Sequence, residues 1–148
     1  VLGYVPRLGR FADVSLHPSA QRPPGVVVYR LDDRLFFANA SYVQGRVREA
    51  VEGAPGEVEW FVFDAEGLVG MDSSGAEALD AMRTELARAG ISFAVARRKA
   101  PVRGRFDTGG LTEAIGVDRF YGTIREAVEA IRPGWEAGWQ DGGDDRGA

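Results

Sequence analysis

Three short apolar segments, separated by stretches with helical spacing, constrain most strongly what this 148-residue chain can fold into. They read VVVYR from residue 26, VEWFVFD from residue 58 and ISFAVA from residue 91. The last two are near-continuous apolar segments, which are typical of strands that are covered on both faces. Strands that alternate with helices predict right-handed crossovers and a mostly parallel sheet. We therefore expect an α/β fold in which helices flank a mixed, mostly parallel β-sheet.

The rest of the chain predicts the remaining elements. The predicted helices run from residue 41 to Gly53, from the serines at 73 and 74 to Gly90, within 97–110, and over 124–131. The further predicted strands lie at 3–7, in a hairpin that turns at Asp32-Asp33 within 26–37, and at 117–121. Residues 1–133 should form one domain, in which 1–25 are a connector with an edge strand. The Gly- and Asp-rich residues 134–148 are expected to be a flexible tail.

The charge and composition of the chain argue against several classes of protein. A net charge of -4 argues against a nucleic-acid partner, because nucleic-acid binding requires an excess of cationic surface. The chain has no cysteine, which excludes disulfides and favours the cytoplasm. No segment approaches the roughly 20 consecutive apolar residues that a membrane helix requires. Because the chain begins at Val1 rather than Met, we expect it to be part of a longer protein.

The reactive side chains argue against an enzyme. The only histidine, His17, lies in a proline-flanked loop, so neither a Ser-His-Asp triad nor a histidine-based metal site can be assembled. Lys99 is the only lysine and is not part of a Gly-x-x-x-x-Gly-Lys motif, which excludes a P-loop nucleotidase. A small hydrolase that acts on nucleotides would lack a nucleophile-base pair. We therefore expect no enzymatic activity, no required cofactor and no metal site.

A polar turn between a predicted strand and a predicted helix is the main candidate site. Asp72-Ser73-Ser74-Gly75 would open a helix whose first backbone N–H groups form a weak anion site. The same residues also fit simple helix capping, because Ser74 and Glu77 form a capping-box pattern and Asp72 or Ser73 could serve as the N-cap. One cap needs one side chain, so the surplus of polar residues is a candidate for function.

Two further features bear on this turn. Asn39 is an expected N-cap of the preceding helix, and it should lie near Ser73 because loops that follow parallel strands gather at one edge of a sheet. A phosphate on Ser73 would add about -1.5 to -2 charges beside Asp72. The stabilisation from the helix terminus is only ~0.3 to 1 kcal/mol, so such a phosphate would act by repelling or recruiting a partner.

A basic segment follows the last long apolar strand. It is either a solvated loop that balances acidic surface elsewhere, or a contact for anionic lipid headgroups or nucleotide phosphates, which arginine clusters favour. Its cationic residues are Arg97, Arg98, Lys99, Arg103 and Arg105.

Four segments of the sequence together resemble the STAS domain, over about residues 3–132. The strand that runs into FDAEGLVGMDSSG, with alternating strands and helices on both sides, is similar to the family pattern. YRLDDRLFFANA and the leading VLGYVPRLGRFADV resemble the branch found in the cytoplasmic tails of SulP anion permeases, and RFDTGGL fits the late glycine-leucine turn of the family. The other branch contains bacterial anti-sigma factor antagonists.

The resemblance implies a regulatory and interaction domain of a sulfate or related anion permease, at the cytoplasmic face of the inner membrane. Its partners would be the transmembrane domain of the same permease, and a regulatory protein or an anionic membrane surface. A purine nucleotide, GTP/GDP or ATP, is the implied ligand, with Asn39, Asp72, Ser73, Ser74 and Gly75 as candidate contacts. The alternative is a free-standing anti-sigma factor antagonist that is switched by phosphorylation, for which the resemblance implies Ser73 as the modified residue.

Overall fold

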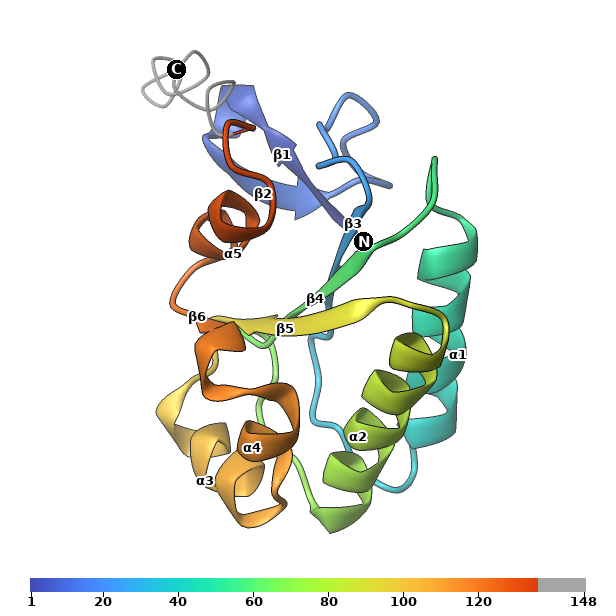
Figure 1. Cartoon of the computed structure of the whole chain (residues 1–148), viewed down its shortest axis with the longest axis vertical. Coiled ribbons are helices and arrows are strands. Elements are labelled where there is room, and N and C mark those ends of the chain that lie inside the picture. The colour runs from blue at the N-terminus through green and yellow to red at the C-terminus, as the bar shows by residue number, and fades with distance from the viewer. Residues whose placement is uncertain (136–148) are drawn as a thin grey trace.

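One six-stranded sheet organises the computed structural model, which describes residues 1–135 (Figure 1). The strands, in their order across the sheet, are β2 (Arg10–Asp13), β1 (Leu2–Val5), β3 (Val26–Arg30), β4 (Trp60–Asp64), β5 (Ser92–Ala96) and β6 (Phe120–Tyr121). Strands β3 to β6 pair in parallel, whereas β1 is antiparallel to both of its neighbours. The expected α/β fold with a mixed, mostly parallel sheet is therefore confirmed.

Helices cover both faces of the sheet because the inner strands are apolar on both sides. One face packs against α1 (Ala40–Glu52), α2 (Ser73–Arg88), α3 (Ala100–Thr108) and α4 (Leu111–Ile115), and the other against α5 (Ile124–Ile131). Successive residues of β4 alternate between the two cores, with Phe61 and Phe63 on the first face and Val62 on the second. This alternation explains why the strand reads as a near-continuous apolar segment.

The first core is built around stacked aromatic rings on neighbouring strands. Phe61 and Phe93 lie in register on β4 and β5, with ring centroids 5.9 Å apart and nearly parallel planes. Tyr29 of β3 lies 6.1 Å from Phe61 on the other side. Such aromatic cross-strand pairs stabilise sheet register, so they fix the relative positions of the strand ends that carry the candidate site.

The predicted hairpin at Asp32-Asp33 is wrong. Both edges of β3 are already occupied, by β1 and β4, so no position remains for a strand that turns back along it. The segment after β3 instead continues forward, and Leu35 forms an isolated parallel bridge with Met71. The hairpin of this fold lies earlier, where β1 and β2 are joined by the short 3-10 helix Pro6–Leu8, and β2 was not predicted.

The other predicted elements differ mainly at their ends. The first strand ends at Val5 because Pro6, which has no N–H to donate to a ladder, begins the 3-10 helix. The predicted strand at 117–121 is shortened to Phe120–Tyr121, since Val117–Arg119 forms a second 3-10 helix. The predicted tail, 134–148, falls almost entirely outside the described residues. Every helix among residues 1–135 falls short of the length and apolar character that a membrane crossing requires.

Candidate functional site

The turn that contains the two serines opens α2 at the carboxyl end of the sheet. Asp72 is the N-cap of this helix, and its carboxylate accepts a hydrogen bond of 2.7 Å from the backbone N–H of Gly75. The predicted capping box of Ser74 and Glu77 therefore does not form, because the helix begins two residues earlier than that box requires. A carboxylate at this position offsets the partial positive charge of the helix N-terminus.

The two serine hydroxyls are not used to hold the turn together. Ser73 is exposed and Ser74 is half-buried. No hydrogen bond is recorded for either hydroxyl within the described part of the chain, whereas the Asp72 carboxylate is engaged. Ser73 is thus accessible for chemistry at its hydroxyl, and the fold does not need that hydroxyl for capping.

Asn39 has a different role from the predicted one. It occupies the N-cap position of α1, but its side chain makes no capping hydrogen bond. Its Oδ1 accepts a bond of 3.0 Å from the N–H of Phe36, and its Nδ2 donates a bond of 2.8 Å to the carbonyl oxygen of Arg34. Asn39 therefore fastens the loop that precedes α1, and both ends of its amide are engaged.

The loops that follow β3 and β4 are joined by backbone hydrogen bonds. Leu35 donates to the carbonyl oxygen of Gly70 at 2.9 Å and accepts from the N–H of Asp72 at 3.3 Å. Asn39, which was expected to lie near Ser73, and Asp72, which directly precedes Ser73, are thus attached to the same short segment, 34–36. Loops that follow parallel strands gather at one edge of a sheet, and here the two loops meet through backbone hydrogen bonds.

Gly75 permits the close contact between these loops. An ideal Cβ built on Gly75 would lie far inside van der Waals contact of the Leu35 carbonyl oxygen and 2.7 Å from the carbonyl carbon. Gly75 is buried, in the first turn of α2. Its presence in the motif is therefore explained by packing between two loops, without any ligand.

Three of the five residues of the predicted basic patch are engaged within the chain. Arg97 pairs with Asp64, Lys99 lies 3.5 Å from a carboxylate oxygen of Glu66, and Arg98 packs against aromatic rings. Arg103 and Arg105 are exposed on α3. A contact with lipid headgroups or nucleotide phosphates stays a prediction, and these two residues are the ones best placed to make it.

Arg98 is held by two aromatic rings and one hydroxyl. Its guanidinium carbon lies 3.9 Å from the centroid of the Phe120 ring, and Nη1 donates a bond of 3.0 Å to Oγ1 of Thr112. The same hydroxyl donates to a carboxylate oxygen of Asp107 at 2.6 Å. Desolvation by burial lowers the pKa of the Arg98 guanidinium from its ordinary value. The half-buried Arg98 thus joins α3, α4 and β6.

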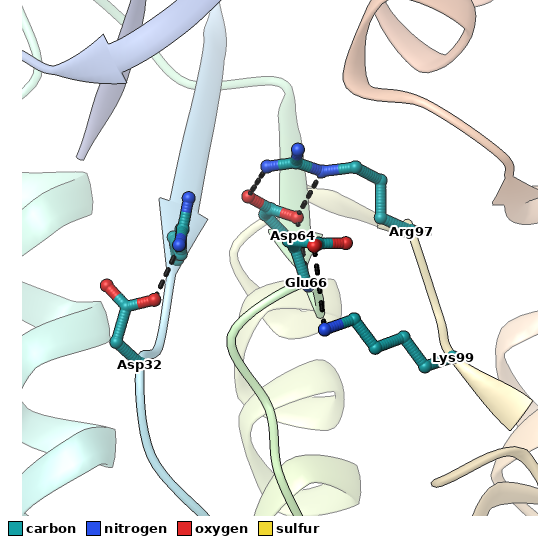
Figure 2. A network of polar contacts seen from close by, with 6 residues as sticks. Asp32, Asp64, Glu66, Arg97 and Lys99 are labelled. Carbon is teal, nitrogen blue, oxygen red and sulfur yellow. Dashed lines mark hydrogen bonds and ion pairs between the residues drawn. The ribbon is translucent and has the colours of Figure 1, made fainter. Parts of the chain in front are cut away.

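A network of ion pairs at the ends of β3, β4 and β5 was not predicted from the sequence (Figure 2). Asp64 has no exposed side-chain surface, and its two oxygens accept bonds of 3.0 and 2.5 Å from Nε and Nη2 of Arg97. The hydrogen bond to Asp64 raises the pKa of Arg97. The sequence does contain one signal for this pair. An acidic residue ends a buried apolar strand, and a buried carboxylate requires a partner.

With this geometry established, comparison with known proteins identifies the family. The family model of the STAS domain matches residues 17–127. The chain belongs to the STAS domain family. It is 45% identical over 132 residues to "Probable sulfate transporter Rv1739c" of Mycobacterium tuberculosis, which is 89% of this chain and 24% of that protein. It is 27% identical over 141 residues to "Sulfate transporter 1.3" of Arabidopsis thaliana, which is 90% of this chain and 22% of that protein.

Solved structures have the same fold. A murine Slc26a9 anion transporter in the inward-facing state matches with a TM-score of 0.78 and 20% identity, over 88% of this chain and 21% of that one. The SulP transporter STAS domain from Vibrio cholerae matches with a TM-score of 0.64 and 21% identity, over 84% and 94%. The unphosphorylated anti-sigma factor antagonist SpoIIAA matches with a TM-score of 0.54 and 28% identity, over 72% and 88%. This STAS domain spans about a quarter of the length of the curated relatives described above.

The role of Gly75 is tested by a matched pair of helix substitutions. Gly75→Ala is expected to lower the free energy of unfolding by about 2 kcal/mol or more, because its Cβ would push the Leu35 backbone away from α2. Gly45→Ala, in the interior of α1 with nothing within 4 Å of the new Cβ, should raise it by about 0.5 to 1 kcal/mol. Urea denaturation measures both, and equal effects at the two positions would contradict the packing role of Gly75.

Proposed function

We propose that this STAS domain is the cytoplasmic regulatory and interaction domain of a SulP-type permease that moves sulfate or a related anion across the inner membrane. The observation that carries the proposal is the 45% identity over 89% of the chain with a probable sulfate transporter. Plant proteins named as sulfate transporters match a similar share of the chain, 90%. In each of these relatives the matched segment is about a fifth to a quarter of the whole protein, so the partner of the domain would be the transmembrane part of its own polypeptide.

Exposed apolar side chains beside the serine turn, residues 72–75, support a role in protein contacts. Phe37, Tyr42 and Val69 are 77%, 70% and 74% exposed, on the two loops that pair at the sheet edge and on the first turn of α1. Large apolar side chains that gather at one edge are suited to contact with another protein. We assign the contact with the permease or with a regulator to this edge.

The whole protein tests this proposal. The longer polypeptide that contains this domain should confer uptake of labelled sulfate on a host that lacks its own sulfate uptake. Phe37→Ser combined with Val69→Ser should reduce that uptake several-fold at equal membrane abundance, whereas Val117→Ser, which removes an equally exposed side chain from a different region, should not. Absence of uptake of sulfate and of related anions by the intact protein would contradict the permease assignment, and equal losses in both variants would contradict the edge contact.

We further propose a purine nucleotide, GTP/GDP or ATP, as a ligand of Asn39 and residues 72–75. Accessible serine hydroxyls at the start of α2 support it. The Asp72 carboxylate opposes it, since it would repel phosphate. Five cavities of about 210 to 520 Å³ in the described part of the chain have none of these residues in their linings, so the nucleotide would lie on the open turn.

Titration with each nucleotide should shift the amide resonances of residues 72–75, and unchanged resonances at millimolar concentration would contradict the ligand.

An antagonist-type phosphoswitch is the second candidate function. It is favoured by the exposed hydroxyl of Ser73 directly after the cap residue, and by the likeness at 28% identity to SpoIIAA. Mass spectrometry of the protein isolated from its own cells should then find phosphate on the peptide with Ser73, and Ser73→Ala should remove it. A gene that joins the domain to membrane helices would exclude a free-standing switch.

A further inference from the structure

The loops that follow β3 and β4, residues 31–39 and 65–72, are packed against each other. Gly67 permits a close approach at the end nearer to the sheet. A Cβ on Gly67 would lie 2.8 Å from the carbonyl oxygen of Leu31 and 2.9 Å from the Cα of Asp32. Backbone hydrogen bonds hold the other end, beside the start of α2. These paired loops therefore form one unit that reaches from the end of the sheet to the serine turn.

The hydrogen bond of the paired loops that lies beside Ser73 is a long one. Asp72 donates its backbone N–H to the carbonyl oxygen of Leu35 at 3.3 Å. The N–H of Leu35, by comparison, donates to the carbonyl oxygen of Gly70 at 2.9 Å. Distances of about 2.7 to 3.2 Å are usual for such bonds. The bond from Asp72 is therefore the one that opens first when this end of the unit is disturbed.

Asp72 connects this bond to the cap of α2. Its carboxylate accepts a bond of 2.7 Å from the N–H of Gly75, while its backbone N–H donates to Leu35. A second negative group, on Ser73, would lie next to the Asp72 carboxylate and repel it. It would also compete for the N–H groups at the start of the helix. When the carboxylate is displaced, the backbone of Asp72 turns with it and its bond to Leu35 is lengthened.

The peptide group between residues 35 and 36 transmits a change at Asp72 to the contact edge. Its carbonyl oxygen accepts from Asp72, and its N–H, on Phe36, donates to Oδ1 of Asn39 at 3.0 Å. The N–H of Asn39 in turn donates to the carbonyl oxygen of Phe36 at 3.2 Å, in a turn that contains the exposed Phe37. Because a peptide group is planar and rigid, loss of the bond on one side allows it to turn and disturbs the bond on the other.

We propose that the paired loops are a conformational switch, in which a negative group on Ser73 opens the bond between Asp72 and Leu35. The opened bond releases the peptide group between residues 35 and 36 and moves Phe37, so the edge that a partner meets changes shape. The side chain of Leu35 has no exposed surface and stays in the core, which confines the change to this end of the loops. The inference rests on the second candidate function for the source of the charge, and it connects that function to the contact edge.

Amide hydrogen exchange, followed by NMR on the 148-residue chain, tests the switch. Ser73→Glu supplies a negative charge without a kinase. The amides of Asp72 and Phe36 should then exchange about three-fold to ten-fold faster, because the hydrogen bond of each is weakened, and the resonances of Phe37 should shift. A negative charge alone slows the base-catalysed exchange of nearby amides, so a faster rate reports an opened bond.

Two controls separate the effect of charge from the effect of side-chain size. Ser73→Gln introduces a side chain of nearly the same size without the charge, and it should leave both exchange rates unchanged. Asp72→Asn keeps a side chain that can cap the helix but removes the carboxylate. In that background Ser73→Glu should not alter the exchange of Phe36, because the repulsion is absent. Unchanged exchange rates in β4 and β5 show that each variant is folded.

The outcomes distinguish the switch from the proposed modification. Faster exchange at Asp72 and Phe36 that requires a negative charge at both positions, 72 and 73, supports the switch. Unchanged rates in Ser73→Glu, equal changes in Ser73→Gln, or an equal effect in the Asp72→Asn background would overturn it, even if cells phosphorylate Ser73. Absence of phosphate on Ser73 in cells would instead contradict the second candidate function, and the measured coupling of the two loops would still stand.

Discussion

The ion pair between Asp64 and Arg97 is the interaction on which the functional edge of this domain depends. Asp64 ends β4 with no exposed side-chain surface, and a buried carboxylate without a partner is strongly destabilising. Arg97 follows β5 directly and satisfies both carboxylate oxygens. The same carboxylate accepts a bond of 3.1 Å from the N–H of Glu66, which sets the direction in which the chain leaves β4. One pair of side chains thus fixes the ends of two central strands.

The serine turn and a small cavity both lie beside this pair. The chain that leaves β4 leads through the loop at 65–71 to Asp72 and Ser73, where α2 begins. Arg97 also lines a small cavity on the α5 side of the sheet. The serine turn presents hydroxyls beside a carboxylate, whereas the cavity presents guanidinium groups.

The sequence predicts those parts of the fold that depend on local pattern. The buried strands Trp60–Asp64 and Ser92–Ala96 and the helix Ile124–Ile131 follow from apolar spacing. The false hairpin at Asp32-Asp33 shows the limit, because local turn residues do not reveal that both edges of β3 are already paired.

The prediction of the site residues was limited for the same reason, because local pattern does not reveal contacts between distant parts of the chain. A count of positive charges in the segment 97–105 identified a candidate contact patch, yet two of its residues pair with acids about 33 positions earlier in the chain. The cavity beside Arg97 likewise combines residues from both ends of the sequence. Ser73 could be predicted as an accessible residue, because helix starts that follow strands are exposed, whereas the packing role of Gly75 required the position of Leu35.

A double-mutant cycle on the Asp64–Arg97 pair tests the central claim most directly. The variants are Asp64→Leu, Arg97→Met and their combination, measured by urea denaturation beside an equivalent cycle on the exposed pair of Arg48 and Glu85. Either single change at the buried pair should lower the free energy of unfolding by about 3 to 5 kcal/mol, and the double change should recover much of that loss. The coupling energy of the exposed pair should be small, because solvent and salt screen the attraction between its charges. A coupling energy at Asp64–Arg97 no larger than that of the exposed pair would contradict the account.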